Sequence, residues 1–100
     1  MDPVKYLEES GVLKNLSESE AKNFFFDTFE KYKDGDLSKD DFAKIISELL
    51  YQHIYDQEVE IKDSGLISAM ELSTELLEVD EKDSDFSSVL DPIEEYISNS

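Results

Sequence analysis

The chain has 100 residues, with 26 acidic side chains against nine basic ones and a net charge of −17. All nine basic residues are Lys, so the guanidinium contacts that usually recognise phosphates and bases are excluded, and nucleic acid or an anionic membrane would be repelled. There is no Cys, which excludes a disulfide, a thiolate metal site and a Cys nucleophile. The charge favours a cation or a basic protein surface as the partner; the alternative is that it only keeps the protein soluble.

The length predicts one domain, residues 1–100, with a modest core built from the 39% of residues that are hydrophobic. No basic-then-apolar leader and no long apolar run is present, so neither a signal peptide nor a membrane span is expected. The expected location is therefore the cytoplasm.

Helix starts recur along the chain. A short first helix is expected over about Pro3 to Glu9, ending at Gly11. Three later segments share one pattern, in which an aliphatic residue precedes a Ser, an acid follows three residues after the Ser, and an apolar residue comes next. The Ser oxygen can cap an unpaired backbone N–H, and the acid suits the helix N-terminus. The three capping serines are predicted to be Ser17, Ser38 and Ser68.

A fourth start is predicted at Asp91, with Pro92 at the first helical position. Gly35 and Gly65 are expected to lie where a helix or loop stops, and residues 57–62 are expected to form an extended linker. The apolar residues after each start recur at helical spacing. The predicted fold is therefore all-α, a small bundle of four to five helices joined by short turns.

No catalytic constellation stands out. His53 is the only His and falls on the apolar side of its predicted helix, which is typical of a packed side chain rather than a general base. The three Gly residues are scattered, so no phosphate-binding loop is present, and a single His without Cys does not make a zinc site. We therefore expect neither an enzyme nor a bound cofactor.

A partial calcium-binding pattern lies over Glu30–Asp41. With Gly35 at the invariant glycine of an EF-hand loop, Leu37 falls on the buried aliphatic position and Asp41 on the last ligand position, where Glu is usual. Tyr32 falls on the third position, where it cannot ligate well. The capped-helix pattern explains the same residues and is preferred. A divergent EF-hand-like calcium-binding module is the alternative.

The acidic charge is uneven. Residues 1–50 hold 12 acids and seven Lys, whereas residues 51–100 hold 14 acids and two Lys. Tyr51 and Tyr55 lie one helical turn apart and lead directly into an acidic stretch, which suits an aromatic anchor surrounded by charges that steer a basic partner. The alternative is that the acids are a solvated face and that both rings pack against the bundle. The predicted partner-binding residues are Tyr51, Tyr55, Asp56, Glu58, Glu60, Glu75, Glu78 and Asp80.

A small, acidic, Cys-free, single-domain helical chain that contains tyrosines resembles the bacterial immunity proteins that neutralise nuclease toxins, as in the colicin and contact-dependent inhibition systems. The segment Phe25 to Leu50 is similar to the helix–turn–helix of the helical colicin-type members, and the rest of the chain carries no such motif. The resemblance rests on Phe29, Gly35, Leu37-Ser38, Asp41-Phe42 and Leu49-Leu50. The adjacent Tyr-Tyr pair of the DNase-colicin immunity proteins is not present, because Tyr51 and Tyr55 are four residues apart.

The resemblance implies a stoichiometric inhibitor, an antitoxin, whose carboxylates occupy a basic nucleic-acid-binding surface of a toxin. The expected function is therefore an acidic, immunity-type inhibitor of a basic nuclease toxin or another nucleic-acid-binding protein. Direct binding of nucleic acid or of a membrane is not expected.

Overall fold

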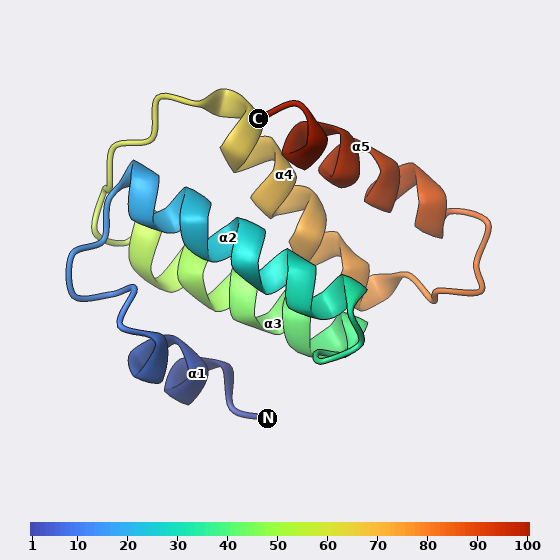
Figure 1. The fold of residues 1–100 in the computed structure, drawn as a ribbon, viewed down its shortest axis with the longest axis horizontal. Coiled ribbons are helices and arrows are strands. Elements are labelled where there is room, and N and C mark those ends of the chain that lie inside the picture. Colours follow the sequence, from blue (N-terminus) through green and yellow to red (C-terminus); the bar gives the residue numbers. More distant parts are fainter.

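The computed structural model describes all residues, 1–100, and confirms an all-α bundle (Figure 1). The chain forms five α-helices, one short π-helical segment after the third and one short 3₁₀ segment after the fourth. These elements are α1 (Pro3–Ser10), α2 (Glu18–Lys33), α3 (Lys39–Leu49), η1 (Leu50–Ile54), α4 (Ser64–Glu75), η2 (Leu76–Glu78) and α5 (Phe86–Ser98). No helix combines the length and the apolar character needed to cross a membrane.

Helix α3 is the central element. It runs antiparallel beside α2, while α1 and α4 cross it from other sides and α5 lies along α4 (Figure 1). The π-helical segment η1 continues α3, and η2 returns to the start of α3. Each end of α3 is therefore joined or contacted by a further segment, η2 at its start and η1 at its end.

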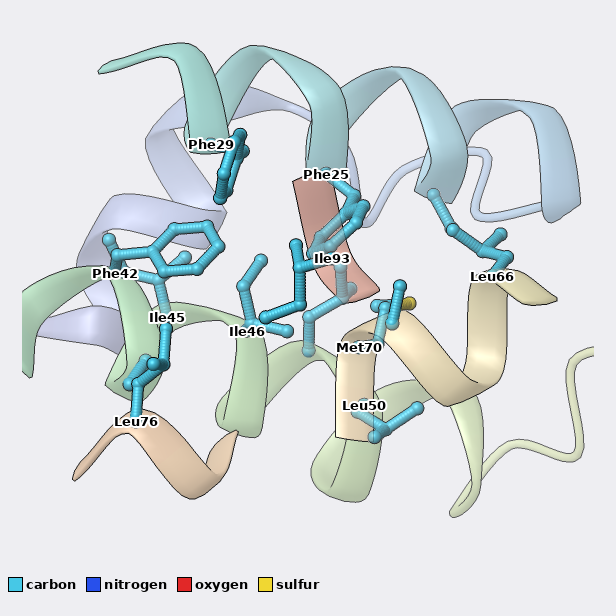
Figure 2. Close-up of a cluster of buried hydrophobic side chains, with 14 of the residues drawn as sticks. Phe25, Phe29, Phe42, Ile45, Ile46, Leu50, Leu66, Met70, Leu76 and Ile93 are labelled. Atoms are coloured by element: carbon cyan, nitrogen blue, oxygen red, sulfur yellow. The ribbon is translucent and has the colours of Figure 1, made fainter. Parts of the chain in front are cut away.

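The core forms one cluster around α3. Phe42, Ile45, Ile46 and Leu49 recur at helical spacing and are fully buried, as their pattern predicts. In Figure 2, Phe25 and Phe29 of α2 point toward the α3 side chains Phe42, Ile45 and Ile46, and Met70 of α4 and Ile93 of α5 lie in the same cluster.

Phe42 is the aromatic centre of this core. Its ring centroid lies 6.2 Å from that of Phe25, 5.6 Å from Phe29 and 5.4 Å from Tyr32, with the Tyr32 ring stacked on it. Offset and edge-on contacts of this kind add to the free energy gained by burying the rings. They fix α2 against the first turns of α3.

Two of the predicted capping serines are confirmed. The Ser17 hydroxyl oxygen accepts a hydrogen bond from the Glu20 N–H at 3.4 Å, and the Ser38 oxygen accepts one from the Asp41 N–H at 3.1 Å. The first helix ends as predicted at Gly11, whose φ of 80° lies in the left-handed region that favours glycine. Gly35, with φ of 87°, ends α2 in the same way.

The prediction that Ser68 caps a helix is wrong. Helix α4 begins at Ser64, and Ser68 lies inside it. The cap is Asp63, whose carboxylate accepts hydrogen bonds from the Gly65 N–H at 3.0 Å and the Leu66 N–H at 3.3 Å. The buried stripe of α4 starts at Leu66, so the helix must already have formed before Ser68.

Gly65 is likewise inside α4 rather than at a helix stop. A Cβ atom at this position would lie 3.0 Å from a ring carbon of Tyr96. The glycine therefore permits the close approach of α5 to the first turn of α4.

The predicted start at Asp91 is also wrong. Helix α5 begins at Phe86 and continues through Pro92, whose missing N–H leaves one backbone hydrogen bond unformed. Phe86 and Ile93 are both buried and lie seven residues apart, which places them two turns apart on one face. Packing of this face against the bundle overrides the local signal at Asp91-Pro92.

The position of the α4 cap gives a stability test. We expect Asp63→Ala to lower the midpoint of thermal unfolding, because it removes the cap of α4 and an acceptor for the Tyr96 hydroxyl. Ser68→Ala is the matched control and should change the free energy of unfolding by no more than about 0.5 kcal/mol, because Ser68 is exposed. Equal losses in thermal unfolding monitored by circular dichroism would contradict a start at Ser64.

Candidate partner-binding surface

Tyr51 and Tyr55 lie on the surface where α3 passes into η1. Their side chains are 42% and 43% exposed, and their ring centroids are 5.5 Å apart in an edge-on arrangement. Leu50 and Ile54, in the same short segment, are buried. The apolar side of η1 therefore anchors it to the core while its other side presents two aromatic rings to solvent.

The π-helical geometry of η1 is defined by the Tyr55 N–H, which donates to the Leu50 carbonyl oxygen at 2.9 Å. A bond between residues five apart widens the turn relative to an α-helix. The sequence predicts an α-helix through this region, so the widened turn is a local departure from that expectation.

Glu71, from α4, lies beside Tyr55. The pKa of the Tyr55 phenol is raised, first by partial burial and next by the negative charge of the Glu71 carboxylate. Glu71 is not among the predicted partner-binding residues, although it stands one helical turn before Glu75. No sequence signal places Glu71 there, because the packing of α4 against α3, which η1 continues, brings it to Tyr55.

Asp56, Glu58 and Glu60 follow Tyr55 and are all exposed. We call the set Tyr51, Tyr55, Asp56, Glu58, Glu60 and Glu71 the tyrosine surface. Only one of its carboxylates meets a lysine, in the exposed pair between Glu60 and Lys62 at 3.9 Å. The surface therefore keeps nearly all its negative charge for a partner.

The lysines elsewhere are used within the chain. Six of the nine lie within 3.9 Å of a carboxylate oxygen, and three of these pairs join neighbouring positions on one helix or adjacent residues. The remaining acids are in large excess, so the field around the protein is negative.

Glu78 and Asp80 lie far from the tyrosines. They line an open hollow of about 390 Å³ with Lys39, at the N-terminus of α3, whereas Tyr51 follows the C-terminus. The 12 residues between Lys39 and Tyr51 span about 18 Å at about 1.5 Å per residue. The structure thus divides the eight predicted partner-binding residues between the two ends of α3, with Glu75 one turn beyond Glu71.

The positive charge of Lys39, which borders this hollow, is neutralised within the chain. The Lys39 ammonium group pairs with Asp40 at 2.8 Å and donates to the carbonyl oxygen of Leu76. Its side chain is only 11% exposed. These contacts tie η2 to the start of α3, which is a structural use for the lysine.

A second hollow, of about 460 Å³, lies beside Tyr96. The Tyr96 hydroxyl donates to the Asp63 carboxylate at 2.7 Å, and Lys22 lies 3.9 Å from the same carboxylate. The hydrogen bond from Tyr96 is the main cause of a lowered pKa at Asp63, and burial raises the pKa of Tyr96. These contacts join α2, α4 and α5, so the hollow borders a structural junction.

The partial calcium-binding pattern does not form a loop of ligands. Glu30 and Tyr32 belong to α2, and Tyr32 stacks on Phe42. No group of three or more His, Cys, Asp or Glu side chains is arranged to hold a metal ion. The capped-helix reading of Ser38 accounts for these residues.

No family model, curated protein or solved structure matches the chain.

The environment of Tyr32 predicts that the stability of the folded state depends on pH in the alkaline range. Burial, followed by the nearby Glu81 carboxylate, raises the pKa of Tyr32 from 10.0 to about 12. Because the folded state holds this proton more tightly than the unfolded chain, the resulting stabilisation is complete below pH 10 and is lost as the pH rises from 10 through 12. Urea unfolding between these pH values should show a shallower loss in Tyr32→Phe than in the native chain.

Tyr96→Phe serves as the comparison, because its raised pKa acts in the same direction. The double variant should flatten the alkaline loss further than either single change. An unchanged slope in all three variants would contradict this account.

Proposed function

We propose that this chain is an acidic, immunity-type inhibitor that neutralises a basic nuclease toxin, or another nucleic-acid-binding protein, by binding its basic surface. The chain acts by stoichiometric binding rather than by catalysis. The observation that carries the proposal is the exposed, edge-on Tyr51–Tyr55 pair set among carboxylates that have almost no lysine partners.

The physical roles within the tyrosine surface differ. A tyrosine ring offers a large apolar area at a small cost in side-chain entropy, so it suits the dehydrated centre of an interface. The surrounding carboxylates attract a basic partner and pair with its Lys or Arg side chains. A toxin surface that binds nucleic acid is basic because it must attract phosphate groups, so it complements the acidic tyrosine surface.

The Lys39 hollow supports the proposal less strongly. Glu78 and Asp80 add to the overall negative field, but they stand beside a lysine and at the other end of α3. The proposal therefore gives them a steering role and gives direct contact to the tyrosine surface.

A direct test uses the proteins encoded on either side of this chain's gene, because a toxin and its inhibitor need to be inherited together, and the proposal expects one of these proteins to be basic. We expect this basic protein and the purified chain to form a one-to-one complex and nuclease activity to disappear at equal concentrations. The association rate measured by stopped-flow fluorescence should fall at least about tenfold between low and high salt. Neighbouring products that neither bind nor cleave nucleic acid, or a rate indifferent to salt, would contradict the proposal.

The placement of the contact surface is tested by matched substitutions. Tyr55→Ala should weaken the complex by about tenfold or more, as expected for a central aromatic anchor. Leu77→Ala is its control, because Leu77 is similarly exposed (37%) but lies in the Lys39 hollow. Isothermal titration calorimetry of both variants measures the difference.

Two double variants separate contact from steering at equal change in charge. Asp56→Asn with Glu71→Gln should weaken binding more than Glu78→Gln with Asp80→Asn. Equal effects would mean that only net charge matters, and the tyrosine surface would then lose its assigned role.

A further inference from the structure

Three helical segments of this chain end at a residue with a left-handed backbone. Two of these residues are Gly11 and Gly35, with φ of 80° and 87°. The third is Glu58, with φ of 53°, and it is the only non-glycine residue with positive φ. In this region the Cβ of an ordinary residue crowds its own backbone, which is why glycine is usual at such a helix end.

Gly35 and Glu58 occupy equivalent positions in the same hydrogen-bonded motif. After α2, the Asp36 N–H donates to the Lys31 carbonyl oxygen at 2.9 Å and the Gly35 N–H to Tyr32 at 3.1 Å. After η1, the Val59 N–H donates to Ile54 at 2.9 Å and the Glu58 N–H to Tyr55 at 3.2 Å. This pair of bonds is the usual left-handed helix stop, and the chain supplies glycine in one copy and glutamate in the other.

The charge of Glu58 is unfavourable as well. A helix carries partial negative charge at its C-terminal end, where cations stabilise it and anions do not. Helix α2 follows this rule, with Glu18 and Glu20 in its first turn and Lys31 and Lys33 in its last. Glu58 departs from it, directly after the last turn of the segment that continues α3.

Nothing within the chain offsets these two costs. Glu58 is exposed, and its carboxylate takes part in none of the side-chain hydrogen bonds or ion pairs of the structure. The backbone bond from Glu58 to Tyr55 nevertheless fixes its position beside the tyrosine pair.

We propose that Glu58 is a specificity-determining residue of the tyrosine surface, kept at a strained helix end because its carboxylate binds a Lys or Arg side chain of the partner. The inference rests on the proposed function and adds a particular contact to it. The partner's cation would lie between the Glu58 carboxylate and the Tyr55 ring, with Glu71 on the α4 side of that ring. Such a cation is held by both an aromatic ring and a carboxylate, which selects for a partner with a basic side chain at that position.

The decisive experiment compares stability and binding in the same variants. Glu58→Gly should raise the thermal midpoint by roughly 4 °C, because it removes both costs. It should also weaken, by about fivefold or more, the complex with the basic protein that the neighbouring-gene test is expected to identify. Glu58→Gln keeps the side chain and the left-handed backbone but loses the charge, so it should weaken binding equally with a smaller gain in stability.

Gly35→Glu is the reciprocal control. It places glutamate in the same motif away from the tyrosine surface, so it should lower the thermal midpoint and leave affinity unchanged. A Glu58→Gly variant that binds as tightly as the native chain, or that gains no stability, overturns the inference. Failure of the native chain itself to bind the basic protein is a different result, which removes the proposed function and this contact together.

Discussion

Burial of α3 is the constraint on which the rest of the structure depends. Its apolar residues contact α1, α2, α4 and η2, so the whole apolar face of this helix is covered, and only polar residues such as Lys44 are exposed between its ends. The two ends of the helix are completed in different ways. Lys39 joins η2 to the first turn, while the widened turn of η1 turns Tyr51 and Tyr55 outward.

The charges follow from the same arrangement. Six of the nine lysines are paired with carboxylates, and two of these pairs join different segments, such as the contact of Lys33 with Glu94 at 2.7 Å between α2 and α5. The acids outnumber them too strongly to be paired, so the excess remains outside. Acids at helix starts are favourable there, as at Asp40 and Asp41 in α3. Those near the C-terminal end of η1 are not.

Local signals predicted the fold where a single side chain satisfies a nearby backbone group. Ser17, Ser38 and Gly11 are of this kind, since each acts within a few residues of itself. They failed where packing between distant segments decides the register. Ser68 and Asp91 both have good capping chemistry, yet the buried faces of α4 and α5 begin several residues earlier, and burial of apolar side chains outweighs one hydrogen bond.

The sequence by itself determined the helical class, the excess of negative charge and the candidate tyrosines, because composition and short-range spacing are sufficient for these. Only the tertiary structure decided which acids share a surface. Glu71 reaches Tyr55 through the packing of α4 on α3, and Glu78 and Asp80 lie at the other end of α3. It also decided that Glu58 stands at a left-handed helix stop. Backbone conformation there is set by hydrogen bonds to η1, and a glutamate in the sequence carries no local sign of it.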